Sequence, residues 1–78
     1  MAGGKKDLAD SGNCGKFVRM LEKAEKFSGN LMNNWESEFV SQMRTSFETR
    51  EDALDMGLTP WNPTVNQWNT LHGIVSKL

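Results

Sequence analysis

Apolar residues recur with the period of an α-helix in three separate parts of the chain. In the first part, residues 16–28, steps of about 100° per residue place on one arc the side chains of Phe17, Met20, Leu21, Ala24 and Phe27. Gly29 follows, and a glycine adopts at no steric cost the left-handed backbone conformation that ends many helices. The pattern therefore predicts a helix over residues 16–28.

A second helix is predicted to begin directly after Asn33. Asn33 and Glu36 have the spacing of a capping box, in which Asn takes the place of Ser or Thr. Beyond this cap an apolar side chain recurs at every fourth position, in Trp35, Phe39, Met43 and Phe47. This spacing indicates an amphipathic helix, and it predicts that Trp35 lies in the core.

The sequence allows two interpretations of how far the second helix extends. Ala53 and Leu54 return to the apolar arc, which favours a continuous helix over residues 33–56. Such a helix would be about 36 Å long, which is long for so small a domain, and a break near Thr49 is therefore the alternative. In both cases Gly57, followed by a leucine and then a proline, predicts the stop.

The segment before the third helix contains two prolines and cannot be helical throughout. Pro60 and Pro63 each lack an amide donor and disfavour helical geometry in the preceding residue. Thr64 and Gln67 form a Thr-x-x-Gln capping box. The apolar stripe that follows comprises Val65, Trp68, Leu71, Ile74, Val75 and Leu78, and it predicts a core position for Trp68 as well. Three amphipathic helices predict an all-α fold, a small three-helix bundle.

The first 14 residues lack the apolar side chains that a packed segment needs. Leu8 is the one sizeable aliphatic residue before Cys14. Burial of so little apolar surface does not offset the entropy of ordering the chain. The sequence therefore predicts a disordered, flexible tail over residues 1–14 and a single helical domain over residues 15–78.

Composition and charge exclude several classes of protein. Nine Lys and Arg against ten Asp and Glu give the 78-residue chain a net charge of −1. This excludes a polycation that coats nucleic acid by bulk charge, and a strongly acidic DNA mimic. One Cys excludes an internal disulfide framework, and one Cys with one His argues against a zinc site. Without a run of roughly 20 apolar residues or a secretory signal, we expect no membrane interaction and a cytoplasmic location.

Catalytic chemistry finds little support in the residues present. His72 is the one histidine, and a boundary histidine that packs its ring is the ordinary interpretation of its position. Cys14 lies among glycines with no activating partner in view. A nucleophile needs an oriented base, and the acidic run Glu48, Glu51, Asp52 and Asp55 is typical of a solvated helix face. We therefore expect no enzyme activity, no catalytic residue, no cofactor and no metal.

The first candidate binding surface is a basic stripe on the first helix. Its cations share an arc of about 80° opposite the apolar face and are Lys16, Arg19, Lys23 and Lys26. Cations along one line suit phosphates or an acidic partner, and Lys5 and Lys6 could extend the line. The alternative is an ordinary solvated face, because Glu22 lies within pairing distance of part of the stripe.

Two further candidates lie near the C-terminus. Asn66, Asn69 and Gly73 share the neutral polar face of the third helix, and a mid-helix glycine, which costs about 1 kcal/mol against alanine, would be explained by a close neighbour. The alternative is a tolerated glycine on a solvated face. Trp61 stands between the two prolines, where it either covers the end of the core or serves as an interface anchor.

Residues 53–68, ALDMGLTPWNPTVNQW, resemble a helix-turn-helix. Ala53 and Gly57 have the Ala-x-x-x-Gly spacing of that family, the Leu-Thr pair that follows matches its turn, and the sequence TVNQW looks like the opening of many recognition helices. The resemblance implies a helix that enters the major groove of DNA by its N-terminal residues. The residues facing DNA would then be Thr64, Asn66, Gln67 and Thr70, with Lys5 and Lys6 on phosphates.

A second resemblance covers residues spread over the last two helices. The pattern Trp35-Glu36-x-x-Phe39, the Leu58-Thr59 pair and the series Gln67-x-x-x-Leu71-x-x-Ile74 are together similar to small helical accessory proteins of bacteriophages. The resemblance implies a phage-encoded protein that acts in the host cytoplasm. It also implies that such a protein modulates nucleic-acid machinery by binding to it.

Three hypotheses of function follow. The leading one is a non-enzymatic binding protein that docks on, and modulates, a protein of nucleic-acid metabolism or host defence. Its predicted contacts are Lys16, Arg19, Lys23, Lys26, Trp61, Asn66, Asn69 and Gly73. The second hypothesis is a DNA-binding module. The third is a self-associating structural module, in which two helices approach closely at Gly73 and form a homodimer.

Overall fold

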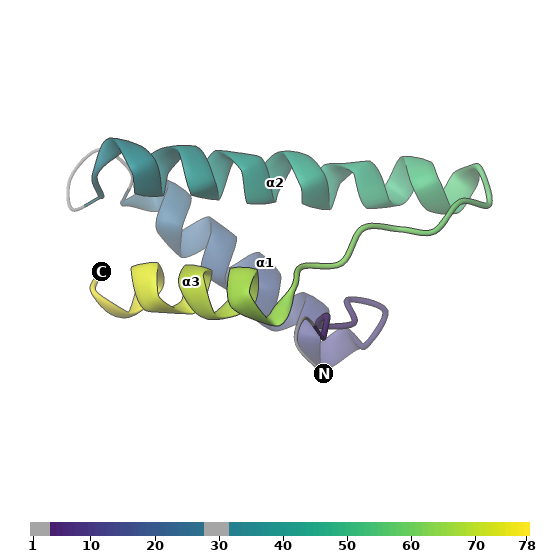
Figure 1. Ribbon diagram of the computed structural model, residues 1–78, viewed down its shortest axis with the longest axis horizontal. Helices are drawn as coiled ribbons and strands as arrows, with labels where there is room; N and C mark the ends of the chain where they lie inside the picture. The colour runs from purple at the N-terminus through teal and green to yellow at the C-terminus, as the bar shows by residue number, and fades with distance from the viewer. Residues whose placement is uncertain (1–3, 28–31) are drawn as a thin grey trace.

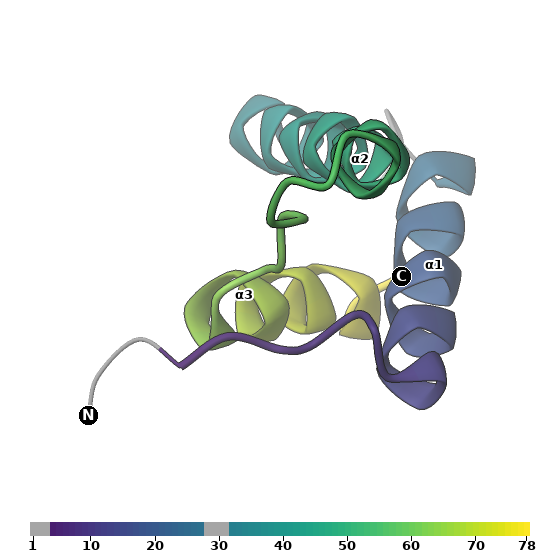
Figure 2. The ribbon, with the colours of Figure 1, turned by 90° about the vertical axis from the view of Figure 1, so that its right-hand side faces the viewer.

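The computed structural model describes residues 4–27 and 32–78, and they form three α-helices. The helices are α1 (Ser11–Lys26), α2 (Asn34–Asp55) and α3 (Val65–Ser76). In Figures 1 and 2, α2 and α3 lie at two levels and α1 runs along one side of both. Helix α1 accordingly packs against each of the others. The all-α three-helix bundle predicted from the sequence is confirmed.

Helix α1 begins five residues earlier than predicted. The Asp10 carboxylate caps it by accepting a hydrogen bond from the Asn13 amide at 3.1 Å. Gly12 and Gly15 lie in the first turns, and their low helix propensity hides this start from a sequence analysis. The helix ends at Lys26, and the glycine predicted to stop it, Gly29, lies outside the described residues.

The predicted tail boundary at residue 14 is also wrong, because it falls inside α1. Residues 1–3 of the predicted tail lie outside the described residues, but residues 4–10 pack along the segment before α3. The Lys6 amide donates to the Pro63 carbonyl at 2.9 Å, and the Val65 amide donates to the Gly4 carbonyl at 2.8 Å. The Leu8 side chain is 3% exposed. One aliphatic residue therefore docks this segment with the help of backbone hydrogen bonds.

Helix α2 is continuous over 22 residues, so the alternative of a break near Thr49 is wrong. The Thr49 hydroxyl donates to the Ser46 carbonyl at 2.6 Å and leaves the helix intact. The predicted capping box is confirmed, because the amide of Glu36 donates to Asn33 and the amide of Asn33 donates to Glu36.

The stop predicted after α2 is confirmed. Gly57 has a φ of 72°, which is the left-handed region that favours glycine. The Leu58 amide donates to the Ala53 carbonyl at 2.8 Å, and the Gly57 amide donates to the Leu54 carbonyl at 3.2 Å. These two bonds form a Schellman motif, which satisfies carbonyls that the end of the helix would otherwise leave without partners.

Helix α3 begins at its predicted cap. The Thr64 hydroxyl accepts a hydrogen bond from the Gln67 amide at 3.0 Å, and the Gln67 side chain accepts one from the Thr64 amide at 3.0 Å. Its buried residues are Leu71 and Ile74. These two side chains belong to the hydrophobic core, and α3 packs against α1.

The fully buried side chains of Phe17, Leu21 and Leu71 form the centre of the core. The prediction that Trp35 lies in the core is wrong, because its side chain is 60% exposed and stacks on Phe39 with the ring centroids 5.5 Å apart. At this end of α2 the neighbouring Glu36 side chain is 13% exposed and pairs with Lys77, so Glu36 and not Trp35 takes the covered position. Trp68 is half-buried, and its ring centroid lies 6.0 Å from that of Phe17.

A buried arginine joins three parts of the chain. Arg50, on α2, points inward and donates hydrogen bonds to the Trp61 carbonyl and, at 2.7 Å, to Asn62 Oδ1. The same Asn62 oxygen accepts a hydrogen bond from the Leu8 amide at 3.0 Å. This network ties α2 and the N-terminal segment to the linker before α3. Sequence analysis missed it, although the signal was present as a charged residue within the apolar arc of α2.

Candidate functional site

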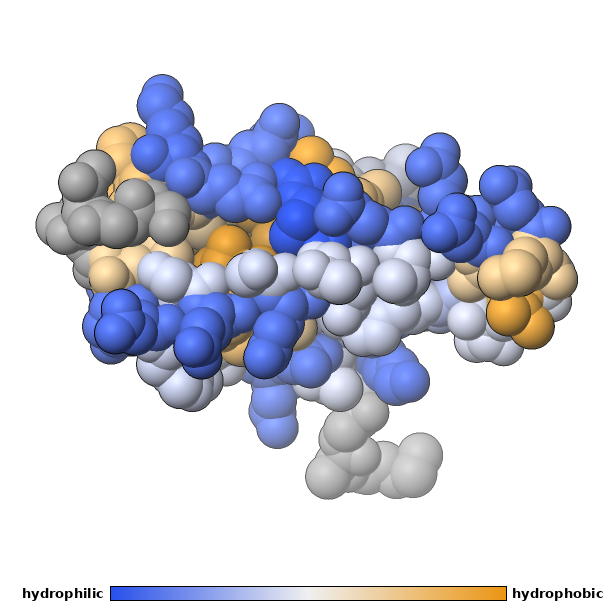
Figure 3. All heavy atoms as spheres, turned by 90° about the horizontal axis from the view of Figure 1, so that it is seen from above, coloured by the Kyte–Doolittle hydropathy of each residue, from blue (hydrophilic) through white to orange (hydrophobic). Residues whose placement is uncertain are grey.

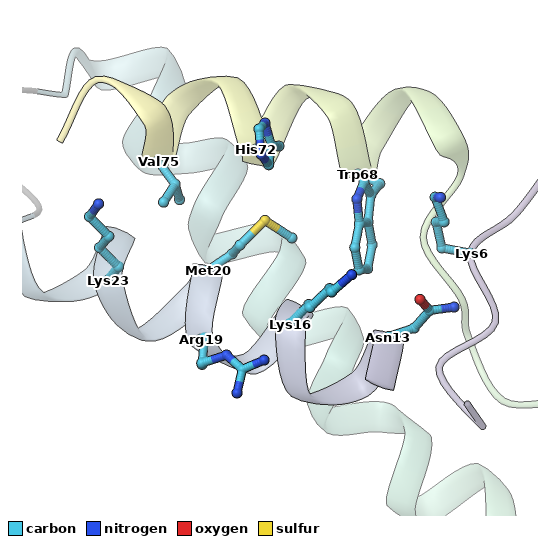
Figure 4. A pocket seen from close by; sticks show the side chains of 9 residues that line it. All are labelled: Lys6, Asn13, Lys16, Arg19, Met20, Lys23, Trp68, His72 and Val75. Carbon is cyan, nitrogen blue, oxygen red and sulfur yellow. The ribbon is translucent and has the colours of Figure 1, made fainter. Parts of the chain in front are cut away.

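A groove lies between α1, α3 and the N-terminal segment, and we call it the basic groove. It encloses about 500 Å³. Helix α1 contributes Asn13, Lys16, Arg19, Met20 and Lys23, helix α3 contributes Trp68, His72 and Val75, and the N-terminal segment contributes Lys6. Figure 4 shows these nine side chains gathered around one hollow.

The wall formed by α1 carries three of the four cations of the predicted basic stripe. Lys16 points toward Trp68, Lys23 lies opposite Val75, and Arg19 lies at the outer edge of the groove (Figure 4). Lys26 belongs to the same predicted stripe but does not line the groove. Its ammonium lies 5.8 Å from the centroid of the Phe27 ring, so Lys26 serves as a comparison residue outside the site.

The wall formed by α3 is largely apolar and was not predicted as part of a site. Trp68, His72 and Val75 stand at i, i+4 and i+7, a spacing that aligns side chains along one line of a helix. The signal was therefore in the sequence, but only the packing of α3 beside α1 turns this line toward the lysines. Met20 lies between the two helices, with its side chain 8% exposed.

The N-terminal segment supplies the fourth cation. The Lys6 ammonium lies 5.4 Å from the centroid of the Trp68 ring, which is within the range of a cation–π interaction. The backbone hydrogen bond from the Lys6 amide to Pro63 fixes this part of the segment beside α3. Lys5, its neighbour in the predicted phosphate contact, is exposed and does not line the groove.

The electrostatic character of the basic groove is strongly positive. Four cations line it, and no carboxylate is among the lining residues. In the described parts of the chain, the ion pairs join Glu25 to Arg44 and Glu36 to Lys77, so none of them neutralises a groove cation. Like charges that converge on low-dielectric walls raise the local potential and attract anions. The groove is therefore suited to an anionic ligand that also offers apolar surface.

The other predicted contacts are spread over the molecule. Asn66, Asn69 and Gly73 are exposed on α3, and a Cβ added to Gly73 would meet nothing within 4 Å. No part of the described chain therefore explains this glycine by close packing. The ring centroid of the half-buried Trp61 lies 5.9 Å from that of Phe17, so Trp61 contributes to the end of the core.

The residues that the helix-turn-helix resemblance assigns to DNA already have internal partners. Thr64 and Gln67 bond each other in the capping box of α3. The Thr70 hydroxyl donates to the Asn66 carbonyl at 2.8 Å. Among these four residues, Asn66 is therefore the one whose side chain can contact a base edge without breaking one of these hydrogen bonds.

A second hollow, of about 720 Å³, lies between the N-terminal segment and the last turns of α2. Leu8, Cys14 and Phe47 give it a mainly apolar lining. Over residues 4–27 and 32–78, no group of three or more His, Cys, Asp or Glu side chains could hold a metal ion. Its charged lining residues are of both signs, Arg44 and Arg50 with Glu48 and Glu51, so this hollow lacks the single sign of charge found in the basic groove.

Comparisons of the chain with protein-family models, with curated proteins and with solved structures returned no match. Within the described residues, no helix combines the length and the apolar character needed to cross a membrane.

Proposed function

We propose that the protein is a non-enzymatic binding protein whose basic groove holds an acidic, amphipathic segment of a partner protein. One observation carries this proposal: four cations surround a hollow whose inner surface is formed by Met20, Trp68 and Val75. An amphipathic helix can place its apolar residues against such a surface while its carboxylates reach the cations. Binding in this way modulates the partner by covering its acidic segment.

A protein segment fits the groove better than a nucleic acid does. Single strands bind by stacking bases on free aromatic faces. The Trp68 ring already stacks on Phe17 at an interplanar angle of 26°, and the Lys6 ammonium lies over it. Met20 and Val75 match apolar side chains, whereas phosphates and sugars make no use of them. The acidic half of α2 also disfavours a long polyanion near the molecule.

The class of partner is proposed from the sequence. The resemblance to small helical accessory proteins of bacteriophages supports a partner in nucleic-acid metabolism or host defence, and an origin in a phage genome with action in the host cytoplasm. Small proteins of this kind act by occupying a surface of a larger one. The basic groove is the surface of this chain that would do so.

The test is the affinity for an acidic amphipathic helical peptide, measured by fluorescence anisotropy across a salt series. The variant Lys16→Gln/Lys23→Gln removes two groove cations, and we expect it to weaken binding about tenfold or more. The matched control Lys5→Gln/Lys26→Gln removes the same charge outside the groove and should bind like the wild type. Equal affinities of the two double variants would refute the proposal.

The same assay with labelled single-stranded and duplex DNA distinguishes the second hypothesis. Tight DNA binding that falls steeply with salt, together with no peptide binding, would replace a protein partner with a nucleic acid. In that case Asn66→Ala should change sequence preference, whereas Lys23→Ala should weaken all DNA equally. We expect weak DNA binding and clear peptide binding.

A further inference from the structure

The C-terminal end of α2 projects from the molecule. Figure 1 shows its last turns, and the turn that follows, extending beyond the ends of α1 and α3. We call residues 48–58 the α2 tip. Its large apolar side chains are exposed to solvent: Leu54 is 58% exposed, Met56 67% and Leu58 58%. In Figure 3 this end of the molecule shows a hydrophobic patch bordered by hydrophilic residues.

The α2 tip is also strongly acidic. Four exposed carboxylates lie on it, those of Glu48, Glu51, Asp52 and Asp55. The one cation among these residues, Arg50, is buried and bonded to the linker. Arg44, just before the tip, lies near Glu48 but forms its ion pair with Glu25, so Glu51, Asp52 and Asp55 keep the exposed face acidic. The last turn of α2 contains no basic residue, and the helix terminus adds its own partial negative charge. The tip is therefore an acidic helical segment with apolar side chains at its end.

We propose that the α2 tip of one copy of this chain binds the basic groove of a second copy. Four exposed anions on the tip match the four cations of the groove, and Leu54, Met56 and Leu58 match its apolar inner surface. The inference rests on the proposed function in one respect, namely that the groove accepts acidic, apolar segments. It adds the chain itself as a ligand of that groove.

The two surfaces produce a head-to-tail contact. No groove-lining residue belongs to α2, so one molecule can use its tip and its groove at the same time. A contact between two different surfaces grows into rings or filaments and does not stop at a symmetric dimer. It also gives the groove a regulator, because a second copy that occupies the groove competes with an acidic segment of the partner protein.

The test is sedimentation velocity of the 78-residue chain with reductant present, so that Cys14 does not form intermolecular disulfides. We expect assemblies larger than a dimer at low salt that dissociate as salt screens the charges. The groove variant Lys16→Gln/Lys23→Gln and the tip variant Glu51→Gln/Asp55→Asn should each weaken self-association about tenfold or more. The control Lys5→Gln/Lys26→Gln for the groove variant, and Glu38→Gln as the control for the single tip variant Asp55→Asn, should assemble like the wild type.

Mixing the two weakened variants identifies the geometry. The groove variant keeps a wild-type tip and the tip variant keeps a wild-type groove, so an equimolar mixture should form dimers and stop there. A mixture that stays monomeric, or variants that assemble like the wild type, would overturn the inference. Circular dichroism confirms that each variant is folded, and Lys23→Gln and Asp55→Asn alone replace any double variant that is not.

The outcomes separate this inference from the proposed function. If the wild type stays monomeric at low salt but its groove binds the acidic peptide, self-association is refuted and the proposed function stands. If the protein assembles through tip and groove but binds no foreign acidic peptide, the proposed function fails and the inference survives. If neither occurs, both fail.

Discussion

Arg50 shows at the scale of one residue how the chain holds its linker in place. Its guanidinium is buried, and its partners are an uncharged carbonyl and an uncharged amide oxygen. Hydrogen bonds to charged groups contribute more than neutral ones. Removal of the Arg50 side chain would also leave the Trp61 carbonyl without this hydrogen-bond donor, and it would remove one of the two donors to Asn62 Oδ1.

We therefore predict that Arg50→Met lowers the free energy of unfolding by about 3 kcal/mol, measured by urea denaturation. The matched control is Arg44→Met on the same helix. Arg44 pairs with Glu25 at the surface, at 2.6 Å, and an exposed pair of this kind contributes at most about 1 kcal/mol. Equal losses in the two variants would show that the Arg50 network does not hold the linker.

We predict opposite effects on stability when Gly57 and Gly73 are each replaced by alanine. Gly57 has a φ of 72°, so Gly57→Ala should destabilise the chain by about 1 kcal/mol. Gly73 is helical, and a Cβ there meets nothing within 4 Å, so Gly73→Ala should stabilise it by about 1 kcal/mol. Thermal unfolding of both variants measures the two signs. Destabilisation by Gly73→Ala would mean that a second molecule packs against this glycine.

At the scale of the elements, the helix ends were predictable because caps are local. Asn33 with Glu36 and Thr64 with Gln67 contain within four residues everything that a capping box requires. The start of α1 also has a local cap, Asp10, but Gly12 and Gly15 in the first turns lower the helix propensity that would reveal it. The packing of the chain before α1 was not predictable in this way. This segment is held by Pro63 and Asn62, more than 50 positions away, and a short sequence window contains neither partner.

The core position predicted for Trp35 was wrong, whereas Met43 is buried and Phe39 and Phe47 pack against the core. Helical periodicity shows which side of a helix is apolar, but not how much of its length the other helices cover. Periodicity also does not show which position at the margin of the arc is covered: Trp35 is 60% exposed, while the Glu36 side chain beside it is 13% exposed and pairs with Lys77. The same limit applies to the basic groove. The α1 lysines were visible as a stripe, whereas Trp68 and His72 joined them only through the packing of α3.

The ion pairs between elements predict an acid-sensitive fold. The side-chain hydrogen bond from Arg44 lowers the pKa of Glu25 below the ordinary 4.5. The side-chain hydrogen bond from Lys77, followed by the backbone bond from Asn33, lowers the pKa of Glu36 in the same direction. Both carboxylates therefore bind protons more weakly in the folded chain than in the unfolded chain. Their contribution is complete above pH 4.5 and is lost as pH falls through the lowered values.

The measurement is the urea midpoint between neutral pH and about pH 3. We predict a decrease toward acid, with a shallower slope in the variant Glu25→Gln/Glu36→Gln. Glu38→Gln is the control, because Glu38 lies on α2 with Glu36 but takes part in neither ion pair. If Glu25→Gln/Glu36→Gln keeps the slope of the wild type, other carboxyl groups determine the acid sensitivity.

At the scale of the whole molecule, a net charge of −1 conceals a separation of charge. The cations gather in the groove between α1 and α3, while exposed anions and apolar side chains gather at the α2 tip. The length of α2 produces this arrangement, because the helix extends beyond its neighbours (Figure 1). Composition alone reports the sum of the charges, and only the fold shows that the two signs occupy different places.

The basic groove is the binding surface that we propose for this protein. The most direct test is an NMR titration of the isotope-labelled protein with an acidic amphipathic helical peptide. We predict that the shifts concentrate at Lys16, Met20, Lys23 and Val75 and at the indole of Trp68, and that they disappear at high salt. Chemical-shift changes confined to the face of α3 that carries Asn66, Asn69 and Gly73, or no changes at low salt, would show that the peptide does not bind in the basic groove.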